Sequence, residues 1–135
     1  MIILLADRSE LARYVEGVTL EMLDHLDQLK KPTTVIYNNA VNLAKNLVKA
    51  DGSIAIRIVK DKFCKELISR FGKPIVSTSA NISGQDAPAN FSQVSDEIKN
   101  GVEYIVQHRR HEVQTSSPSA IIKWNNNGSL TIIRP

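Results

Sequence analysis

The sequence predicts an α/β fold built on a sheet of mixed strand direction, and two observations support this prediction. Short apolar or β-branched runs alternate with helical patterns along most of the chain, which is the arrangement of α/β proteins. Two further β-rich runs close the chain, joined by a turn that ends in Asn127-Gly128. Asn-Gly between two such runs predicts a hairpin, so the last two strands should be antiparallel.

The expected strands are short apolar or β-branched runs bounded by turn residues. In the run at residues 54–58, isoleucines alternate with other residues, so Arg57 is expected on the opposite face from the isoleucines. This alternation predicts a half-buried strand that presents Arg57 on its second face. The expected strands are residues 2–5, 33–37, 53–58, 75–76, 104–106, 120–124 and 129–133.

The expected helices begin at capping residues and carry apolar side chains at helical spacing. Ser9, Thr19 and Asp61 are expected N-caps, and Gly72 should end the helix that follows Asp61. Cys64 lies on the apolar side of that helix, which favours a core residue over a nucleophile. The expected helices are residues 9–15, 19–29, 41–48, 62–71 and 91–99.

Length and composition fit one compact domain covering residues 1–135. Hydrophobic residues make up 42% and charged residues 23% of the chain, as in ordinary soluble proteins. The single cysteine, Cys64, excludes an internal disulfide and a cysteine-cluster metal site. The apolar runs are too short to span a bilayer, and residues 1–8 lack the layout of a signal peptide. We therefore expect a cytoplasmic protein with no membrane partner.

A polar segment follows the apolar run at residues 75–76 and is the most informative part of the chain. Ligands of open α/β sheets bind at the carboxyl ends of strands, and Ser77, Ser79 and Asn81 can hydrogen-bond a polar ligand. Gly84 allows close approach of the backbone. Alternatively, these side chains only cap turns and the next helix. The segment taken alone leaves both interpretations open.

Common catalytic motifs are missing from the sequence. It has no P-loop, no G-x-G-x-x-G after a strand and no G-x-S-x-G, and its three histidines lack partners at common metal-ligand spacings. The remaining hydroxyls, Asn81 and arginines suit binding and stabilisation of phosphates better than nucleophilic catalysis. The basic group at residues 108–111 is either a solvated loop or a contact for nucleotide or RNA phosphates; the net charge of +3 permits such a partner.

Four segments, in order, match one family's motifs. Residues 32–36 resemble its Pro-Leu-Thr strand, and residues 52–58 resemble its Ala-x-Arg-x-Pro strand, with Val59 where proline is usual. Residues 74–84 match Pro-x-x-x-Thr-Ser-Ala-Asn-x-Ser-Gly almost throughout. Residues 117–122 with 132–134 resemble its closing Ser-Thr-Ile hairpin, with Ala120 in place of threonine. The chain thus resembles the YrdC-like family, best known for threonylcarbamoyl-AMP synthases of tRNA modification.

This resemblance implies a twisted mixed sheet with flanking helices around a large concave basic cavity. It also implies a reaction in which threonine, bicarbonate and ATP give threonylcarbamoyl-AMP and pyrophosphate, with tRNA as the later acceptor. Mg²⁺ would accompany ATP, and no tightly bound cofactor is expected. By motif, Thr34 and Ser79 are implied in substrate binding, and no catalytic residue is assigned. The implied nucleotide-binding residues are Arg57, Ser77, Ser79, Asn81, Ser119 and Arg134.

The family's usual first third, with its Pro-Thr-Asp-Thr-Val-Tyr-Gly-Leu strand and Lys-x-Arg-Pro element, has no counterpart in this sequence. The resemblance therefore implies an N-terminally truncated domain that corresponds to the C-terminal two thirds of the usual one. Three functions remain open: the synthase activity, a non-catalytic module that binds a nucleotide or double-stranded RNA, and a fragment without activity. Exposed sheet edges would favour a homo-oligomer.

Overall fold

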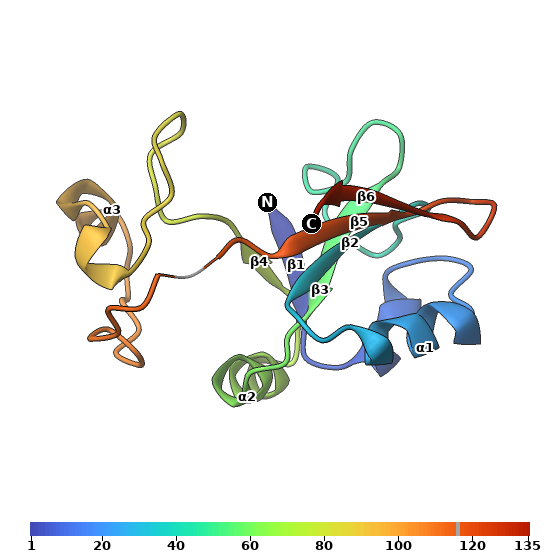
Figure 1. The fold of residues 1–135 in the computed structure, drawn as a ribbon, viewed down its shortest axis with the longest axis horizontal. Coiled ribbons are helices and arrows are strands. Elements are labelled where there is room, and N and C mark those ends of the chain that lie inside the picture. The colour runs from blue at the N-terminus through green and yellow to red at the C-terminus, as the bar shows by residue number, and fades with distance from the viewer. Residues whose placement is uncertain (116) are drawn as a thin grey trace. The chain divides into compact units, whose positions relative to one another are not determined.

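A computed structural model describes residues 1–115 and 117–135. The chain divides into two compact units. The sheet unit consists of Met1–Ser77 and Ser119–Pro135, and the insertion unit is Thr78–Pro118. In Figure 1 the insertion unit is the yellow to orange part that carries helix α3.

The sheet unit is built on one six-stranded sheet of mixed direction. Its strand order is β4-β1-β3-β2-β5-β6, with β1 parallel to β3 and β2 parallel to β5. The other neighbours are antiparallel, so the predicted mixed α/β sheet is confirmed. The strands are β1 (Ile2–Leu5), β2 (Thr33–Tyr37), β3 (Ile54–Ile58), β4 (Ile75–Ser77), β5 (Ala120–Trp124) and β6 (Leu130–Arg134).

The larger core lies on one face of this sheet, because alternate residues of each strand point to the same side. Helix α1 (Leu20–Gln28) contributes Met22 and Leu26 to this core. The strand residues in it are Ile3, Leu5, Val35, Tyr37, Ile54 and Ile56. A smaller cluster on the other face joins Leu4 to Ile68 of helix α2 (Lys62–Phe71).

The first two helices begin at side-chain caps. The Thr19 hydroxyl accepts a hydrogen bond from the Met22 amide at 3.3 Å, as predicted for α1. The 3₁₀-helix η1 (Arg8–Arg13) begins at Asp7, whose carboxylate accepts from the Ser9 amide at 2.8 Å. The prediction of Ser9 as the cap was therefore wrong, because Asp7 offers the better-placed acceptor.

Helix α2 confirms the prediction made from its two ends. The Asp61 carboxylate accepts from the Cys64 amide at 2.9 Å, and Gly72 ends the helix in the left-handed conformation with φ of 76°. Only Ile68 of this helix is fully buried, whereas Leu67 and Phe71 are 44% and 59% exposed. The buried side of this helix is thus narrower than the spacing of its apolar residues predicted.

The predicted helix at residues 41–48 is wrong, because this segment is irregular. Two of its polar groups bond to a distant part of the chain. The Val41 amide donates to the Tyr14 carbonyl at 2.8 Å, and the Asn42 amide group donates to the Arg13 carbonyl at 2.8 Å. Asn42 is also in the left-handed conformation, with φ of 57°, which interrupts a right-handed helix.

The insertion unit contains the short helices η2 (Phe91–Gln93) and α3 (Asp96–Asn100). The predicted continuous helix at 91–99 is wrong because Val94 is extended and Ser95 caps a new helix, accepting from the Ile98 amide at 3.4 Å. Residues 104–106 form no strand. Within the ranges described, no helix is long and apolar enough to cross a membrane.

Candidate functional site

The second face of the sheet gathers most of the polar residues that the sequence singled out. We call it the polar face, meaning the side that carries Thr34, Arg57 and Lys123. Residues opposite each other on neighbouring strands point to the same side, and Val35 faces Ile56, so Thr34 lies beside Arg57. The row across the six strands is Ile75, Leu4, Arg57, Thr34, Ile121 and Arg134, and the next row is Ser77, Ile2, Ala55, Ile36, Lys123 and Thr131.

Alternation along the strands explains why these side chains share a face. Val35 and Tyr37 pack in the larger core, which turns Thr34 to the other side. Ile122 and Trp124 of β5 also pack against that core, which turns Lys123 away from it. Burying every second residue thus positions the polar residues between them.

Thr34, Ser119 and Arg134 form a connected cluster on the polar face. Thr34 is 1% exposed, and its hydroxyl lies 3.2 Å from the Ser119 hydroxyl. Nε and Nη2 of Arg134 both donate to the Ser119 carbonyl, at 2.9 and 2.6 Å. A pair of hydroxyls shares one hydrogen and leaves the other as a donor, so this cluster can donate a hydrogen bond to a ligand.

Arg57 is the most available guanidinium of the face. It is half-buried and forms no ion pair or hydrogen bond with the residues that the structure describes. Ser77 lies on the same face at the edge formed by β4, where it pairs with Ile2. The sheet unit therefore brings together five of the residues implied as binding residues: Thr34, Arg57, Ser77, Ser119 and Arg134.

Ser79 and Asn81 belong to the insertion unit, and Asn81 closes its own loop. Its Nδ2 donates to the carbonyls of Ile82 and Gln85, at 3.0 and 2.9 Å. Its Oδ1 is buried and has no hydrogen-bond partner in the described part of the chain. The Nδ2 half of the Asn81 amide thus supports the turn, and the buried Oδ1 half has no partner among the described residues.

Both arginines of the basic group at residues 108–111 form hydrogen bonds within the insertion unit. Arg109 donates two hydrogen bonds of 2.7 Å to Glu112, which hold the pKa of that carboxyl below its usual range. Arg110 donates to the carbonyls of Val106 and Ile105, at 2.8 and 2.6 Å, and lies 5.4 Å from the centre of the Phe91 ring. These contacts favour the loop interpretation over a phosphate contact.

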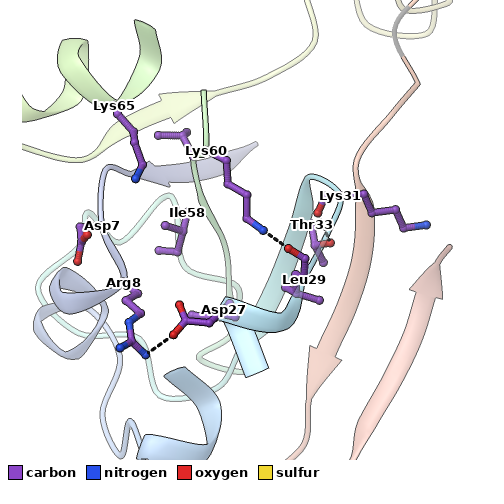
Figure 2. Close-up of a pocket in the computed structure, with 11 residues that line it drawn as sticks. Asp7, Arg8, Asp27, Leu29, Lys31, Thr33, Ile58, Lys60 and Lys65 are labelled. Carbon is purple, nitrogen blue, oxygen red and sulfur yellow. Dashed lines mark hydrogen bonds and ion pairs between the residues drawn. The ribbon is translucent and has the colours of Figure 1, made fainter. Parts of the chain in front are cut away.

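A separate cavity of about 220 Å³ lies in the sheet unit and has several cations in its lining. Figure 2 shows Arg8 directed at Asp27 and Lys60 directed at the carbonyl of Leu29. The Arg8–Asp27 ion pair measures 3.0 Å. These partners join η1 and the segment after β3 to α1 and its C-cap, so Arg8 and Lys60 are used in holding the fold together.

The polar face offers neutral donors and cations. None of the twelve residues of its two rows is acidic or a histidine. Within residues 1–115 and 117–135, no three His, Cys, Asp or Glu side chains are grouped to hold a metal ion. Lys123 is the one cation of this face that the sequence analysis missed. The only signal for it was that Lys123 and Ser119 are four residues apart along an alternating segment.

Comparison with known proteins gives a consistent result. The Sua5/YciO/YrdC family model, described as "Telomere recombination", matches residues 1–135. Threonylcarbamoyl-AMP synthase from Pseudoalteromonas translucida is 31% identical over 109 residues, which cover 78% of this chain and 58% of that protein. The enzyme of the same name from Dichelobacter nodosus is 36% identical over 85 residues, which cover 60% and 44%. The chain spans about half the length of these curated relatives.

Solved structures share the fold. A variant of Sua5 from P. abyssi superposes with a TM-score of 0.85 at 21% identity, covering 99% of this chain and 40% of that one. Full-length HypF in a phosphate- and nucleotide-bound form gives 0.73 at 18% identity, covering 98% of this chain and 21% of HypF. The predicted twisted α/β architecture with flanking helices is thereby confirmed.

Proposed function

Because the chain belongs to the Sua5/YciO/YrdC family, we propose that it acts in the synthesis of threonylcarbamoyl-AMP from threonine, bicarbonate and ATP. Its relatives named threonylcarbamoyl-AMP synthase support this proposal. The observation that carries it is the grouping of Thr34, Arg57, Ser119 and Arg134 on one sheet face, although they come from four different segments of the chain.

The proposed reaction forms two bonds. The threonine amine attacks the carbon of bicarbonate, a C–N bond forms, and water leaves, which gives a carbamate. A carbamate oxygen then attacks the α-phosphorus of ATP, and the bond from this phosphorus to pyrophosphate breaks. The negative charge that grows on the phosphate oxygens is what a protein must stabilise in such a step.

The residues of the polar face suit this task. Arg57 and Arg134 would offset the phosphate charge, and the Thr34–Ser119 hydroxyl pair would donate one hydrogen bond to the substrate. Ser77, at the edge of this face, would donate to the sugar or base of the nucleotide. In the insertion unit, taken by itself, the motif residues Ser79 and Asn81 are proposed as nucleotide contacts from the family resemblance alone. HypF, whose structure was solved in a phosphate- and nucleotide-bound form, shares this fold over 21% of its length. Catalysis would come from positioning and charge stabilisation.

Mg²⁺ and tRNA would take part without dedicated residues on the polar face. Mg²⁺ prefers carboxylate, carbonyl and phosphate oxygens, and the two rows of the polar face contain no carboxylate. The ion would therefore arrive bound to the phosphates of ATP, as part of the substrate. The tRNA would receive the threonylcarbamoyl group from the product in a later step.

A nucleotide-binding module without turnover is the second candidate. The observation that favours it is that the polar face carries hydroxyls and cations but no carboxylate or imidazole that could remove the proton of the threonine amine. Such a face would bind a nucleotide and leave the chemistry to another protein.

The test measures pyrophosphate release by the 135-residue chain in the presence of ATP, Mg²⁺, threonine and bicarbonate. We expect release that requires both threonine and bicarbonate, and a loss of about tenfold or more in Arg57→Met, because one charge-assisted contact contributes about 1.5–3 kcal/mol. Arg70→Met, which removes an exposed arginine of α2, is the matched control and should keep full activity.

The outcomes separate the candidates. Release that continues without threonine would contradict the proposed reaction. Binding of ATP in calorimetry without pyrophosphate release would support the second candidate. Absence of both binding and release would contradict the two candidates together.

A further inference from the structure

Lys123 occupies an unusual position for a lysine. It lies near the middle of β5, where it pairs with Ile36 on β2 and Thr131 on β6. Lysine is depleted in strands, and this one is half-buried. Because Ile122 and Trp124 pack in the larger core, the Lys123 side chain leaves the sheet on the polar face.

The ammonium group of Lys123 has no acidic side chain in direct contact with it among the residues that the structure describes. It forms no ion pair or hydrogen bond with the residues that the structure describes. The pKa of the Asp51 carboxyl is lowered first by its hydrogen bonds with Ser53 and, to a smaller extent, by the positive charge of Lys123. A half-buried ammonium group without a direct hydrogen-bond partner can gain one from an anion bound on the same face.

The position of Lys123 complements that of Arg57. The two residues are separated by two strand spacings, about 10 Å, and by two residues along the strands, about 7 Å, so their backbones lie about 12 Å apart. The floor between them consists of Thr34, Ile36 and Ile121. Two long cationic side chains at such a separation can reach the two ends of an extended anion.

The remaining cation of the face, Arg134, already donates hydrogen bonds within the protein. Its Nε and Nη2 both bind the Ser119 carbonyl, so only part of its donor set can face a ligand. A chain of phosphates carries more negative charge than the Arg57 guanidinium alone can offset. A second available cation would share this charge with Arg57 and with the Mg²⁺ that accompanies ATP, and Lys123 is placed to supply it.

We propose that Lys123 is a phosphate-binding residue that holds the terminal phosphates of a nucleoside triphosphate, with Arg57 at the other end of the phosphate chain. This inference rests on the proposed function, since it assigns the ligand to the same face. A lysine suits this end because its ammonium is a mobile point charge that can follow a terminal phosphate.

The test measures the affinity of ATP, ADP, AMP and adenosine, with Mg²⁺ present, by calorimetry for the wild-type chain and Lys123→Met. We expect Lys123→Met to lose about tenfold or more in ATP affinity, a smaller factor for ADP and almost nothing for AMP or adenosine. Lys123→Arg should retain most of the affinity for ATP. Lys49→Met is the matched control, because Lys49 also acts on the Asp51 carboxyl but lies outside the strands, between β2 and β3, and it should bind like wild type.

The results distinguish the two proposals. Equal losses for all four ligands would mean that Lys123 only supports the structure, and an unchanged ATP affinity would also overturn its assignment while leaving the proposed function intact. A wild-type chain that does not bind ATP would overturn both. Circular dichroism checks that Lys123→Met is folded, and Lys123→Gln replaces it if it is not.

Discussion

Individual polar residues of this sheet are placed by partners far away in the sequence. Thr34 and Ser119 meet at 3.2 Å although 85 positions separate them. Local alternation was enough to predict that Arg57 leaves its strand on the face away from the isoleucines. It was not enough for Lys123, because the neighbours of Lys123 are defined only by the pairing of β5 with β2, which no local pattern reveals.

Tyr37 gives a pH-dependent prediction. It is 2% exposed, and burial raises the pKa of its phenol above the ordinary value, which is about 10. A raised pKa means that the folded state keeps the proton more strongly than the unfolded state. The stability that this provides is complete below pH of about 10 and is lost as the pH rises further.

The measurement is urea unfolding between pH 8 and pH 11 for wild type and Tyr37→Phe. The free energy of unfolding of wild type should fall more steeply above pH of about 10 than that of Tyr37→Phe, which lacks the ionisable group. Parallel curves for the two proteins would show that Tyr37 ionises equally well in both states.

At the level of helices and strands, the local signals at the ends of α1 and α2 were reliable, whereas the expected cap of η1 was not. Asp61 and Gly72 predicted both ends of α2. The segment at 41–48 has helical spacing of its apolar residues but bonds to Arg13 and Tyr14 instead. The apolar residues have helical spacing, but long-range hydrogen bonds hold the segment in an irregular conformation. A sequence pattern does not reveal such long-range bonds.

The Asp61 cap leads to a second prediction, for α2. Asp61→Ala removes the acceptor of the Cys64 amide and should lower the free energy of unfolding by about 1 kcal/mol. Asp61→Asn keeps an oxygen in the same place and should cost less than half as much. Urea unfolding measures both, together with hydrogen exchange of the first-turn amides of α2. Equal losses for alanine and asparagine would show that the charge, and not the hydrogen bond, matters.

At the scale of the whole molecule, the sheet ends at β6 with an apolar edge. β6 is the last strand in the sheet order, and Ile132 and Ile133 are 70% and 55% exposed. An exposed, apolar edge strand can pair with another chain. We expect the protein to self-associate through this edge as its concentration rises.

Sedimentation velocity over a range of concentrations tests this expectation. Ile132→Lys should shift the population toward monomer, because a charge on an edge strand opposes pairing. Leu20→Lys, at a 78% exposed position of α1 away from the edge, is the control and should sediment like wild type. A wild-type chain that remains monomeric at the highest concentration would contradict the expectation.

The division of the chain into two units has a consequence for redesign and for divergence within the family. The backbone leaves the sheet after Ser77 and re-enters it at Ser119, and β4 and β5 are four places apart in the strand order. Four strand spacings amount to about 19 Å, which an extended linker of about six residues can cross. The segment between these points can therefore be lengthened, shortened or exchanged while the strand order stays the same, so the sheet can accept other inserted segments at this place.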